Sequence, residues 1–257
     1  LYRESTSLRG REGRIWLFYV SVSLGGWRGS AINARVSDDK GLSWGPAKRF
    51  ITSPFLNLST LIRGPVVTDS KGYMRLPVYH EFLGKFSELL TIDPLSGDVM
   101  NKVRLTSGRS AIQTVLVHFG NGKMTAFMRK TGSSPSRIAV VSSGDGGNNW
   151  GPISFTSLRN PDAAIFAYRT RKEEVLLAFN DSERDRHNLK LAISMDDGQS
   201  FRMFHTVKPP RKEDSSSRLA YPWIVQTSDG NFHLFYTWNR EHIVHVTFNR
   251  LWLEEQF

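Results

Sequence analysis

Short apolar runs, each preceded by a turn, recur along the chain at intervals of roughly fifty residues. Five such runs are EGRIWLFYV (12–20), KGYMRLPVY (71–79), NGKMTAFMR (121–129), KEEVLLAFN (172–180) and DGNFHLFYT (229–237). Runs this short, without a long stretch of helical periodicity, are typical of β-strands. The pattern predicts an all-β chain in which each repeat contributes one strongly apolar strand.

A second motif follows nearly the same period. The pattern Ser-x-Asp-x-Gly-x-x-Trp fits residues 37–44 and 143–150, and it fits 194–201 with Phe in place of Trp. Degenerate copies start at Thr91 and Thr247, so that successive starts lie just over fifty residues apart. Repeats of about fifty residues with about four strands each are typical of β-propeller blades. No linker or shift in composition divides the chain, so residues 1–257 are predicted to form a single domain.

The aspartates of this motif, Asp39, Asp145 and Asp196, could serve as catalytic carboxylates, as metal ligands or as turn residues. A feature repeated in every blade is unsuited to a single active site. The distal Glu that an EF-hand calcium loop requires is missing from all three copies. Asp accepts backbone N–H groups in tight loops, and Gly tolerates positive φ. The motif therefore predicts a hairpin turn.

This repeat is the Asp-box, or BNR repeat, and the chain resembles the sialidase (neuraminidase) superfamily, particularly its bacterial predicted-neuraminidase branch. The most similar stretch is YPWIVQTSDGNFHLFYTWNREHIVHV (221–246), supported by LPVYHE (76–81) and IQTVLV (112–117). The resemblance implies a six-bladed β-propeller. Five visible repeats then predict that the N-terminal blade is incomplete in this chain.

The resemblance also implies a set of site residues. Sialidases use three arginines to hold the carboxylate of the sugar, a Tyr paired with a Glu as nucleophile, and an Asp as acid and base; Tyr nucleophiles are exceptional among glycosidases. Tyr221 falls at the position of the nucleophile, and Arg129 and Arg186 fall at the positions of the second and third arginines. Arg63, in LIRGP, is a further candidate ligand. A guanidinium matches a carboxylate through two parallel hydrogen bonds.

Two departures from the family pattern bear on the chemistry. Gln113 stands where the Glu partner of the nucleophile is expected, and an amide cannot accept the proton. Residues 19–33, where the acid/base loop should lie, contain no Asp. Glu81, which follows the apolar run in VYHEF, is the best replacement carboxylate, although a salt bridge at a rim explains it equally well. Its neighbour His80 should point to the opposite face of the strand.

Composition limits the kinds of partner and chemistry that are expected. The 257 residues carry a formal net charge of +10, with a sequence pI near 10.0, which favours anionic partners. The absence of Cys excludes disulfides, thiolate metal sites and a Cys nucleophile. No apolar run approaches the roughly 20 residues that cross a bilayer. No cofactor or metal site is expected. The chain begins at Leu1, so we expect a missing N-terminal segment, and periplasmic, secreted and cytoplasmic locations all remain open.

Four functions remain open on this basis. The first is an exo-acting glycosidase that hydrolyses a terminal, sialic-acid-like sugar, with Tyr221 as nucleophile and Glu81 as its partner. The second is a lyase or hydrolase of the same fold that acts on uronic-acid polysaccharides through Glu81, His80 or Tyr221. The third is a glycan-binding propeller without turnover, which Gln113 favours. Nucleic-acid binding comes last, because the aromatic residues occupy strand and turn positions suited to a core.

Overall fold

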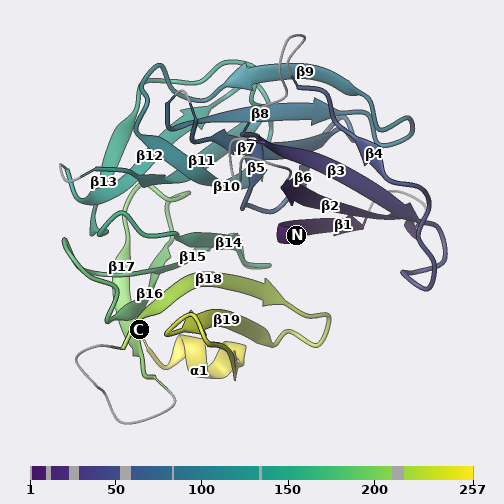
Figure 1. The fold of residues 1–257 in the computed structure, drawn as a ribbon. Helices are drawn as coiled ribbons and strands as arrows, with labels where there is room; N and C mark the ends of the chain where they lie inside the picture. The colour runs from purple at the N-terminus through teal and green to yellow at the C-terminus, as the bar shows by residue number, and fades with distance from the viewer. Residues whose placement is uncertain are drawn as a thin grey trace. The chain divides into compact units, whose positions relative to one another are not determined.

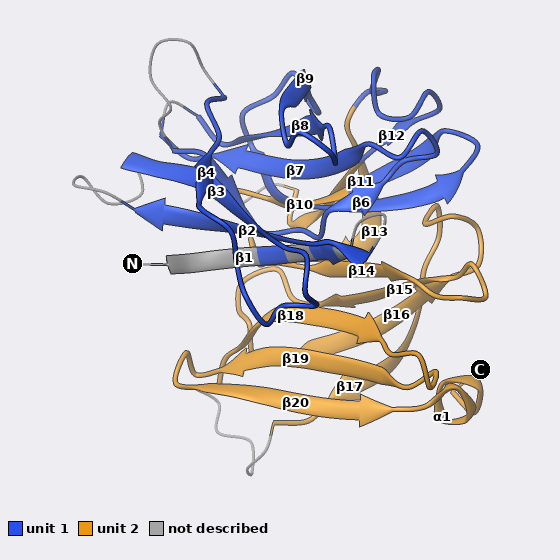
Figure 2. Cartoon of the chain, turned by 90° about the vertical axis from the view of Figure 1, so that its right-hand side faces the viewer, with its two compact units in different colours: residues 1–126, 141–152 blue, residues 127–140, 153–257 orange. Residues whose placement is uncertain are grey.

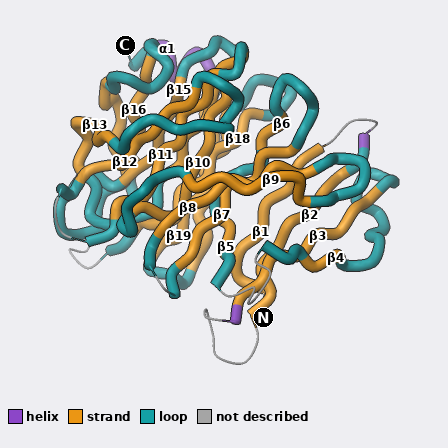
Figure 3. The backbone as a smooth tube through the Cα atoms, turned by 90° about the horizontal axis from the view of Figure 1, so that it is seen from above, coloured by secondary structure: helices purple, strands orange, loops and turns teal. Residues whose placement is uncertain are grey.

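The computed structural model describes residues 2–9, 13–22, 29–52, 59–82, 84–132, 135–209 and 217–256 (Figure 1). Within these residues, twenty strands form five antiparallel sheets, and the short helix α1 (Arg250–Glu254) follows the last strand. Strands joined by turns and loops make up nearly all of the regular structure (Figure 3). The all-β prediction is therefore confirmed.

Each sheet is built from strands that are consecutive in the sequence. The first contains β1 (Tyr2–Arg9), β2 (Ile15–Val22), β3 (Ser30–Ser37) and β4 (Lys48–Arg49). The second contains β5 (Leu61–Ile62), β6 (Val67–Thr68), β7 (Met74–His80), β8 (Phe86–Ile92) and β9 (Val99–Arg104), with both β5 and β6 paired to β7.

The remaining three sheets repeat this order. The third contains β10 (Ala111–Gly120), β11 (Lys123–Lys130), β12 (Arg137–Ser143) and β13 (Ser154–Arg159). The fourth contains β14 (Phe166–Arg169), β15 (Val175–Phe179), β16 (Leu189–Ser194) and β17 (Arg202–Val207). The fifth contains three described strands, β18 (Leu219–Gln226), β19 (Phe232–Trp238) and β20 (His242–Phe248).

The five apolar runs of the sequence form equivalent strands. They correspond to β2, β7, β11, β15 and β19, each of which pairs with the first strand of its sheet. All five residues of β15 are buried, as expected for a strand covered on both faces. The repeat seen in the sequence is thus the repeat of the sheets.

The Asp-boxes lie in the turns between the third and fourth strands. In the first copy, Asp39 Oδ1 accepts the backbone N–H of Ser43 at 2.8 Å, and the Ser37 Oγ accepts that of Gly41 at 2.7 Å. Asp145 and Asp196 accept equivalent bonds from the backbone N–H groups of Asn149 and Ser200. The predicted turn role is confirmed.

These hydrogen bonds perturb the carboxyl groups. Bonds from the side chain and the backbone of Ser43 lower the pKa of Asp39 to about 2, and the equivalent bonds from Ser200 lower the pKa of Asp196 to about 2. A carboxylate that accepts several hydrogen bonds is stabilised in its charged form. The low pKa values therefore have a structural cause and indicate no catalytic acid.

The two degenerate copies behave differently. Asp93 lies in the turn between β8 and β9, where its Oδ1 accepts the backbone N–H of Leu95 at 2.7 Å. Asn249 instead caps α1, because its side chain accepts the backbone N–H of Trp252 at 2.8 Å. The last repeat therefore ends in a helix where the others form a hairpin.

The chain divides into two compact units. Unit 1 contains residues 1–126 and 141–152, and unit 2 contains residues 127–140 and 153–257 (Figure 2). The core of unit 1 includes Trp16, whose ring stacks on that of Phe18 at a centroid distance of 5.8 Å. In unit 2 the rings of Phe127 and Phe201 meet edge to face at 5.8 Å. That residues 1–257 form one domain stays a prediction.

Candidate functional site

Two of the predicted arginines meet at one residue in unit 2. The Nε of Arg129, on β11, donates to Asp162 Oδ1 at 2.6 Å, and Nη2 of Arg186 donates to the Asp162 backbone oxygen at 2.7 Å. The side chain of Arg129 is 15% exposed and that of Asp162 is 33% exposed. Asp162 thus binds both guanidinium groups, Arg129 through its carboxylate and Arg186 through its backbone carbonyl.

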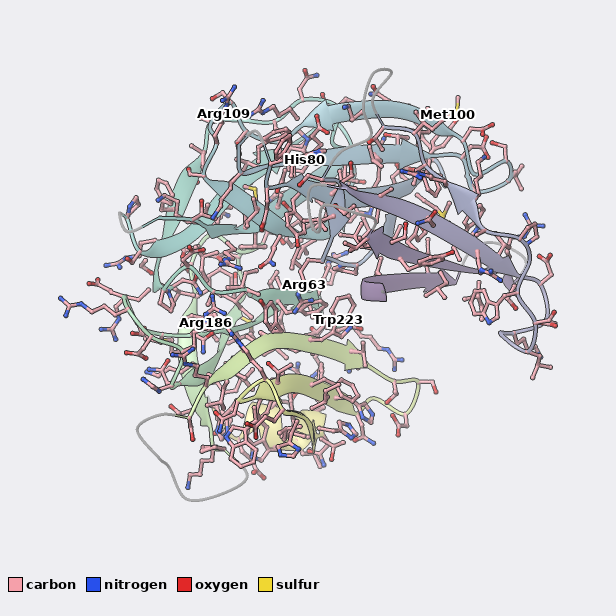
Figure 4. The ribbon with its side chains drawn as sticks, in the orientation of Figure 1. Arg63, His80, Met100, Arg109, Arg186 and Trp223 are labelled. Atoms are coloured by element: carbon pink, nitrogen blue, oxygen red, sulfur yellow. The ribbon has the colours of Figure 1, made fainter. Side chains whose placement is uncertain are left out.

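Local sequence explains how Asp162 and Arg186 reach this place. Asp162 follows Pro161 in the turn before β14, and it adopts φ 54°, a left-handed conformation that Asp tolerates better than most residues. Asn160 Oδ1 accepts the backbone N–H of Ala163 at 3.0 Å and closes this turn. Arg186 lies between β15 and β16, where its carbonyl oxygen accepts the backbone N–H of Leu219, the first residue of β18 (Figure 4).

Tyr221 joins the same group of side chains. It lies on β18 at φ 54°, within an irregularity in the pairing with β19 between Ala220 and Trp223. A bulge of this kind turns a side chain out of the regular alternation of the strand. Tyr221 is 37% exposed while Ala220 is buried, so its ring faces outward from a well-packed strand. Strained φ values for bulky residues are frequent at functional sites.

The electrostatics connect Arg186 to both neighbours. Burial is the largest cause that lowers the pKa of Arg186, and the positive charge of Arg129 lowers it further. The interaction of Arg186 with Tyr221, which includes a hydrogen bond, and the negative charge of Asp162 oppose these effects. A guanidinium remains protonated at neutral pH despite such shifts. Arg186 is therefore a half-buried cation beside a second cation, an arrangement that an anion would stabilise.

The other three predicted residues belong to unit 1. Arg63 directly follows β5 and is half-buried. Gln113, near the start of β10, is 4% exposed and has φ 54°. Glu81 directly follows β7 and is exposed, with its backbone N–H donated to the Ser59 Oγ at 3.1 Å. The structure therefore brings Arg129, Arg186 and Tyr221 together within unit 2.

His80 has a carboxylate partner that the sequence did not reveal. Its Nε2 lies 2.8 Å from Glu88 Oε2, and its ring stacks on Phe86 at 4.6 Å (Figure 4 labels His80). Burial alone would raise the pKa of Glu88, but His80 and Lys102 outweigh it, and the pKa is lowered. His80 is thus held within its own sheet by Glu88 and Phe86 of β8.

A left-handed residue recurs at or just before the first strand of the last four sheets. The four residues are Ser59, Gln113, Asp162 and Tyr221, each with φ of 54°. Asp162 was missed by the sequence analysis. Its detectable signal was the turn sequence Asn-Pro-Asp placed one repeat after Gln113 and one repeat before Tyr221.

In the described ranges, no group of three or more His, Asp or Glu residues could hold a metal ion. Among the described helices, none is long and apolar enough to cross a membrane.

A cavity of about 590 Å³ in unit 2 is lined mainly by apolar and aromatic side chains, including Phe248 and Trp252. It contains none of the arginines discussed above, and Lys208 is the one lysine in its lining.

Comparison with known proteins identifies relatives of this fold. Residues 6–234 match the family model described as "BNR repeat-like domain". No curated protein matches the chain. The Hadza microbial sialidase Hz136 is similar in structure, with a TM-score of 0.75 and 14% identity over 96% of this chain and 52% of that one.

Two further structures show the same likeness. The Trypanosoma rangeli sialidase, in complex with the inhibitor DANA, has a TM-score of 0.73 and 15% identity over 99% of this chain and 46% of that one. A protein of unknown function from Dyadobacter fermentans has a TM-score of 0.76 and 15% identity over 96% of this chain and 76% of that one. The chain spans about half the length of the two sialidases. Likeness at this identity shows the fold, an all-β sialidase-like propeller with five described blades.

Proposed function

The chain belongs to the BNR repeat-like domain family, and from this premise we propose that it is a sialidase-like exo-glycosidase. Its substrate is a glycan that ends in an acidic, sialic-acid-like sugar. The observation that carries the proposal is the meeting of Arg129, Arg186 and Tyr221 in unit 2. The sialidases that share the fold support the choice of substrate class.

The arginines suit the carboxylate of the sugar. Arg186 donates one N–H group of Nη2 to the Asp162 carbonyl, and Arg129 donates its Nε to the Asp162 carboxylate. A guanidinium has five N–H donors, so it can bind a carboxylate while some of its donors are engaged within the protein. Arg63 is proposed as a further ligand of the same carboxylate.

Tyr221 is proposed as the nucleophile. A neutral phenol, unlike a carboxylate, can approach the anomeric carbon of an anionic sugar without charge repulsion. Phenols titrate near pH 10, so attack at neutral pH requires a base that takes the proton. The bond between the Tyr221 oxygen and the anomeric carbon forms as the glycosidic bond breaks, and the oxygen of the leaving group takes up a proton.

Two carboxylates are candidates for the base. Glu81 is the replacement carboxylate that the sequence offers in place of the amide at Gln113, and it is exposed. Asp162 is linked to Tyr221 through Arg186, which contacts both residues. Substitution of each by its amide separates the two assignments. Gln113 is proposed to bind a hydroxyl group of the sugar through its amide.

A second candidate function is glycan binding without turnover. The buried amide of Gln113 favours it, because a sialidase of the usual pattern has a carboxylate there. Residues 19–33 also lack an Asp, although residues 23–28 lie outside the described ranges. Tyr221 would then be a surface on which the sugar stacks.

We also propose, from the resemblance, that the complete propeller has six blades and forms one domain.

The test is an assay of a fluorogenic sialoside and of unsaturated-uronate release with the wild type and three variants. We expect Tyr221→Phe to reduce sialoside turnover to below about one-hundredth. Arg186→Lys should raise KM by about tenfold to a hundredfold, because charge-assisted hydrogen bonds are lost. Tyr168→Phe, a half-buried tyrosine on β14, is the matched control and should keep full activity. Unsaturated uronate as the product would assign the protein to the lyases.

A further inference from the structure

A second cavity in unit 2 lies directly beside Arg186. Its volume is about 330 Å³, and its charged lining comprises Arg184, Arg186, Arg218, Arg240, Asp162 and Asp185. Four arginines and two aspartates thus line it. We call this cavity the arginine pocket.

We propose that the arginine pocket binds a second anionic group, a sulfate or a carboxylate, of the glycan whose terminal acidic sugar Arg129 and Arg186 hold. This inference rests on the proposed function, because it extends the same site. It makes the preferred substrate a glycan with two acidic groups close together.

The positive charge of the pocket is largely uncompensated within the protein. Arg184, Arg218 and Arg240 are exposed, and none of them forms an ion pair with a carboxylate in the described part of the chain. Asp162 is already paired with Arg129. Asp185 Oδ1 accepts the backbone N–H of His187 at 3.2 Å and so helps to shape its own turn.

The backbone around the pocket is held in place before any ligand binds. Leu219 donates to the Arg186 carbonyl at 2.9 Å, and His187 Nδ1 lies 2.7 Å from the Ser217 carbonyl oxygen. Arg218 and Asn239 exchange two bonds, since the Arg218 N–H donates to Asn239 Oδ1 and the Asn239 N–H donates to the Arg218 carbonyl, both at 2.8 Å. These bonds hold the backbone, so the ordering cost of binding falls mainly on the arginine side chains.

Geometry and chemistry together select the class of ligand. Arg186 and Asp162 line the pocket and also belong to the cluster with Tyr221, so one glycan can contact both places. Guanidinium groups bind sulfate and carboxylate oxygens through paired hydrogen bonds. The pocket volume accommodates one such group with part of the sugar that carries it.

The experiment compares the double variant Arg218→Gln/Arg240→Gln with the control Arg49→Gln, an exposed arginine on the outer strand β4. All proteins carry Tyr221→Phe, so that hydrolysis does not interfere. Calorimetry measures Kd at a fixed salt concentration for sialyllactose, for sialyllactose with a sulfate on galactose, and for disialyllactose. The second and third probes distinguish a sulfate from a carboxylate.

We expect the better of the two doubly anionic probes to bind about tenfold more tightly than sialyllactose. The double variant should remove this gain and leave the Kd of sialyllactose within about twofold, whereas Arg49→Gln should change neither. A gain that survives in the double variant, or no gain with either probe, overturns the inference.

Failure of the proposed function gives a different result. If sialyllactose neither binds nor is hydrolysed by the wild type, the sialidase proposal fails. Galactose-sulfated lactose, which has no sialic acid, then tests the pocket alone. Its binding should be lost in the double variant and retained in Arg49→Gln; equal binding to both variants refutes the pocket.

Discussion

Gly198, in the third Asp-box, lets two parts of unit 2 pack against each other. It has φ of 84°, and a Cβ atom placed on it would lie 2.5 Å from Cζ of Phe127. Phe127 is fully buried on β11 and also contacts the ring of Phe201. Gly198→Ala should therefore introduce both backbone strain and a steric clash.

Gly41, at the same position of the first Asp-box, allows the cost of backbone strain to be measured apart from the cost of the steric clash. Gly41 has φ of 93°, but a Cβ atom placed on it would lie 3.9 Å from its nearest neighbour, a ring carbon of Trp44. Positive φ costs an L-residue about 1–2 kcal/mol, and overpacking of a core adds about 1–3 kcal/mol. Gly41→Ala should thus cost about 1–2 kcal/mol and Gly198→Ala about 2–5 kcal/mol.

Thermal and urea unfolding of the two variants measure this difference. For a chain of this size, 1 kcal/mol corresponds to about 2–4 °C in Tm. Adding Phe127→Leu to Gly198→Ala makes room for the methyl group, so the double variant should be less destabilised than the sum of the two single changes. Equal destabilisation by Gly41→Ala and Gly198→Ala would refute the packing argument and leave backbone conformation as the whole effect.

Three further predictions concern charged groups. Since the folded pKa of Asp196 is about 2 and its ordinary value is 3.8, its carboxylate stabilises the fold above about pH 4, and this stabilisation is lost as the pH falls toward 2; the stability gap between the wild type and Asp196→Asn should narrow over that range in urea titrations. Asp181→Asn should cost about 1–2 kcal/mol in urea unfolding, because this buried carboxylate pairs with Arg159 and Lys190 at 2.9 and 2.7 Å; no loss of stability would contradict that role. Asp162→Asn should lower sialoside turnover more than Glu81→Gln if Asp162 is the base, and the reverse order of the two rates would assign the base to Glu81.

Much of the fold could be predicted because short local sequence patterns specify each repeat. Each apolar run, such as residues 172–180, is long enough for one buried strand and is preceded by its own turn residues. Each Asp-box closes its turn with hydrogen bonds inside eight residues. Where the local pattern was weaker, at Asn249, the same Asn that fits a degenerate turn caps a helix instead.

The candidate site was only partly predictable, because it depends on contacts between distant segments. The family resemblance supplied Arg129, Arg186 and Tyr221, but nothing in the sequence near Arg129 indicates that Asp162, 33 residues later, is its partner. The charged loop 180–188 contains no motif that indicates a binding site. Its role as a wall of the arginine pocket arises from bonds to residues 217–219, which lie a full strand pair away in the sequence.

The left-handed residues show how one architecture accommodates different chemistry. A φ of 54° recurs at Ser59, Gln113, Asp162 and Tyr221, at corresponding places in four sheets. Because the conformation is repeated, it reflects how each sheet begins, and it marks no single residue as catalytic. The side chains differ, however: that of Asp162 binds Arg129, and that of Tyr221 interacts with Arg186. Strain of this kind is maintained by the surrounding structure. The fold therefore provides the same backbone conformation in each of these sheets, and the type of residue at that position determines whether it serves the site.

Exchange of Ser59 for Gly should relieve the strain without loss of binding, whereas Tyr221→Gly should relieve it and abolish binding. Comparison of the two variants by unfolding and by calorimetry separates the architectural role of the conformation from its functional role.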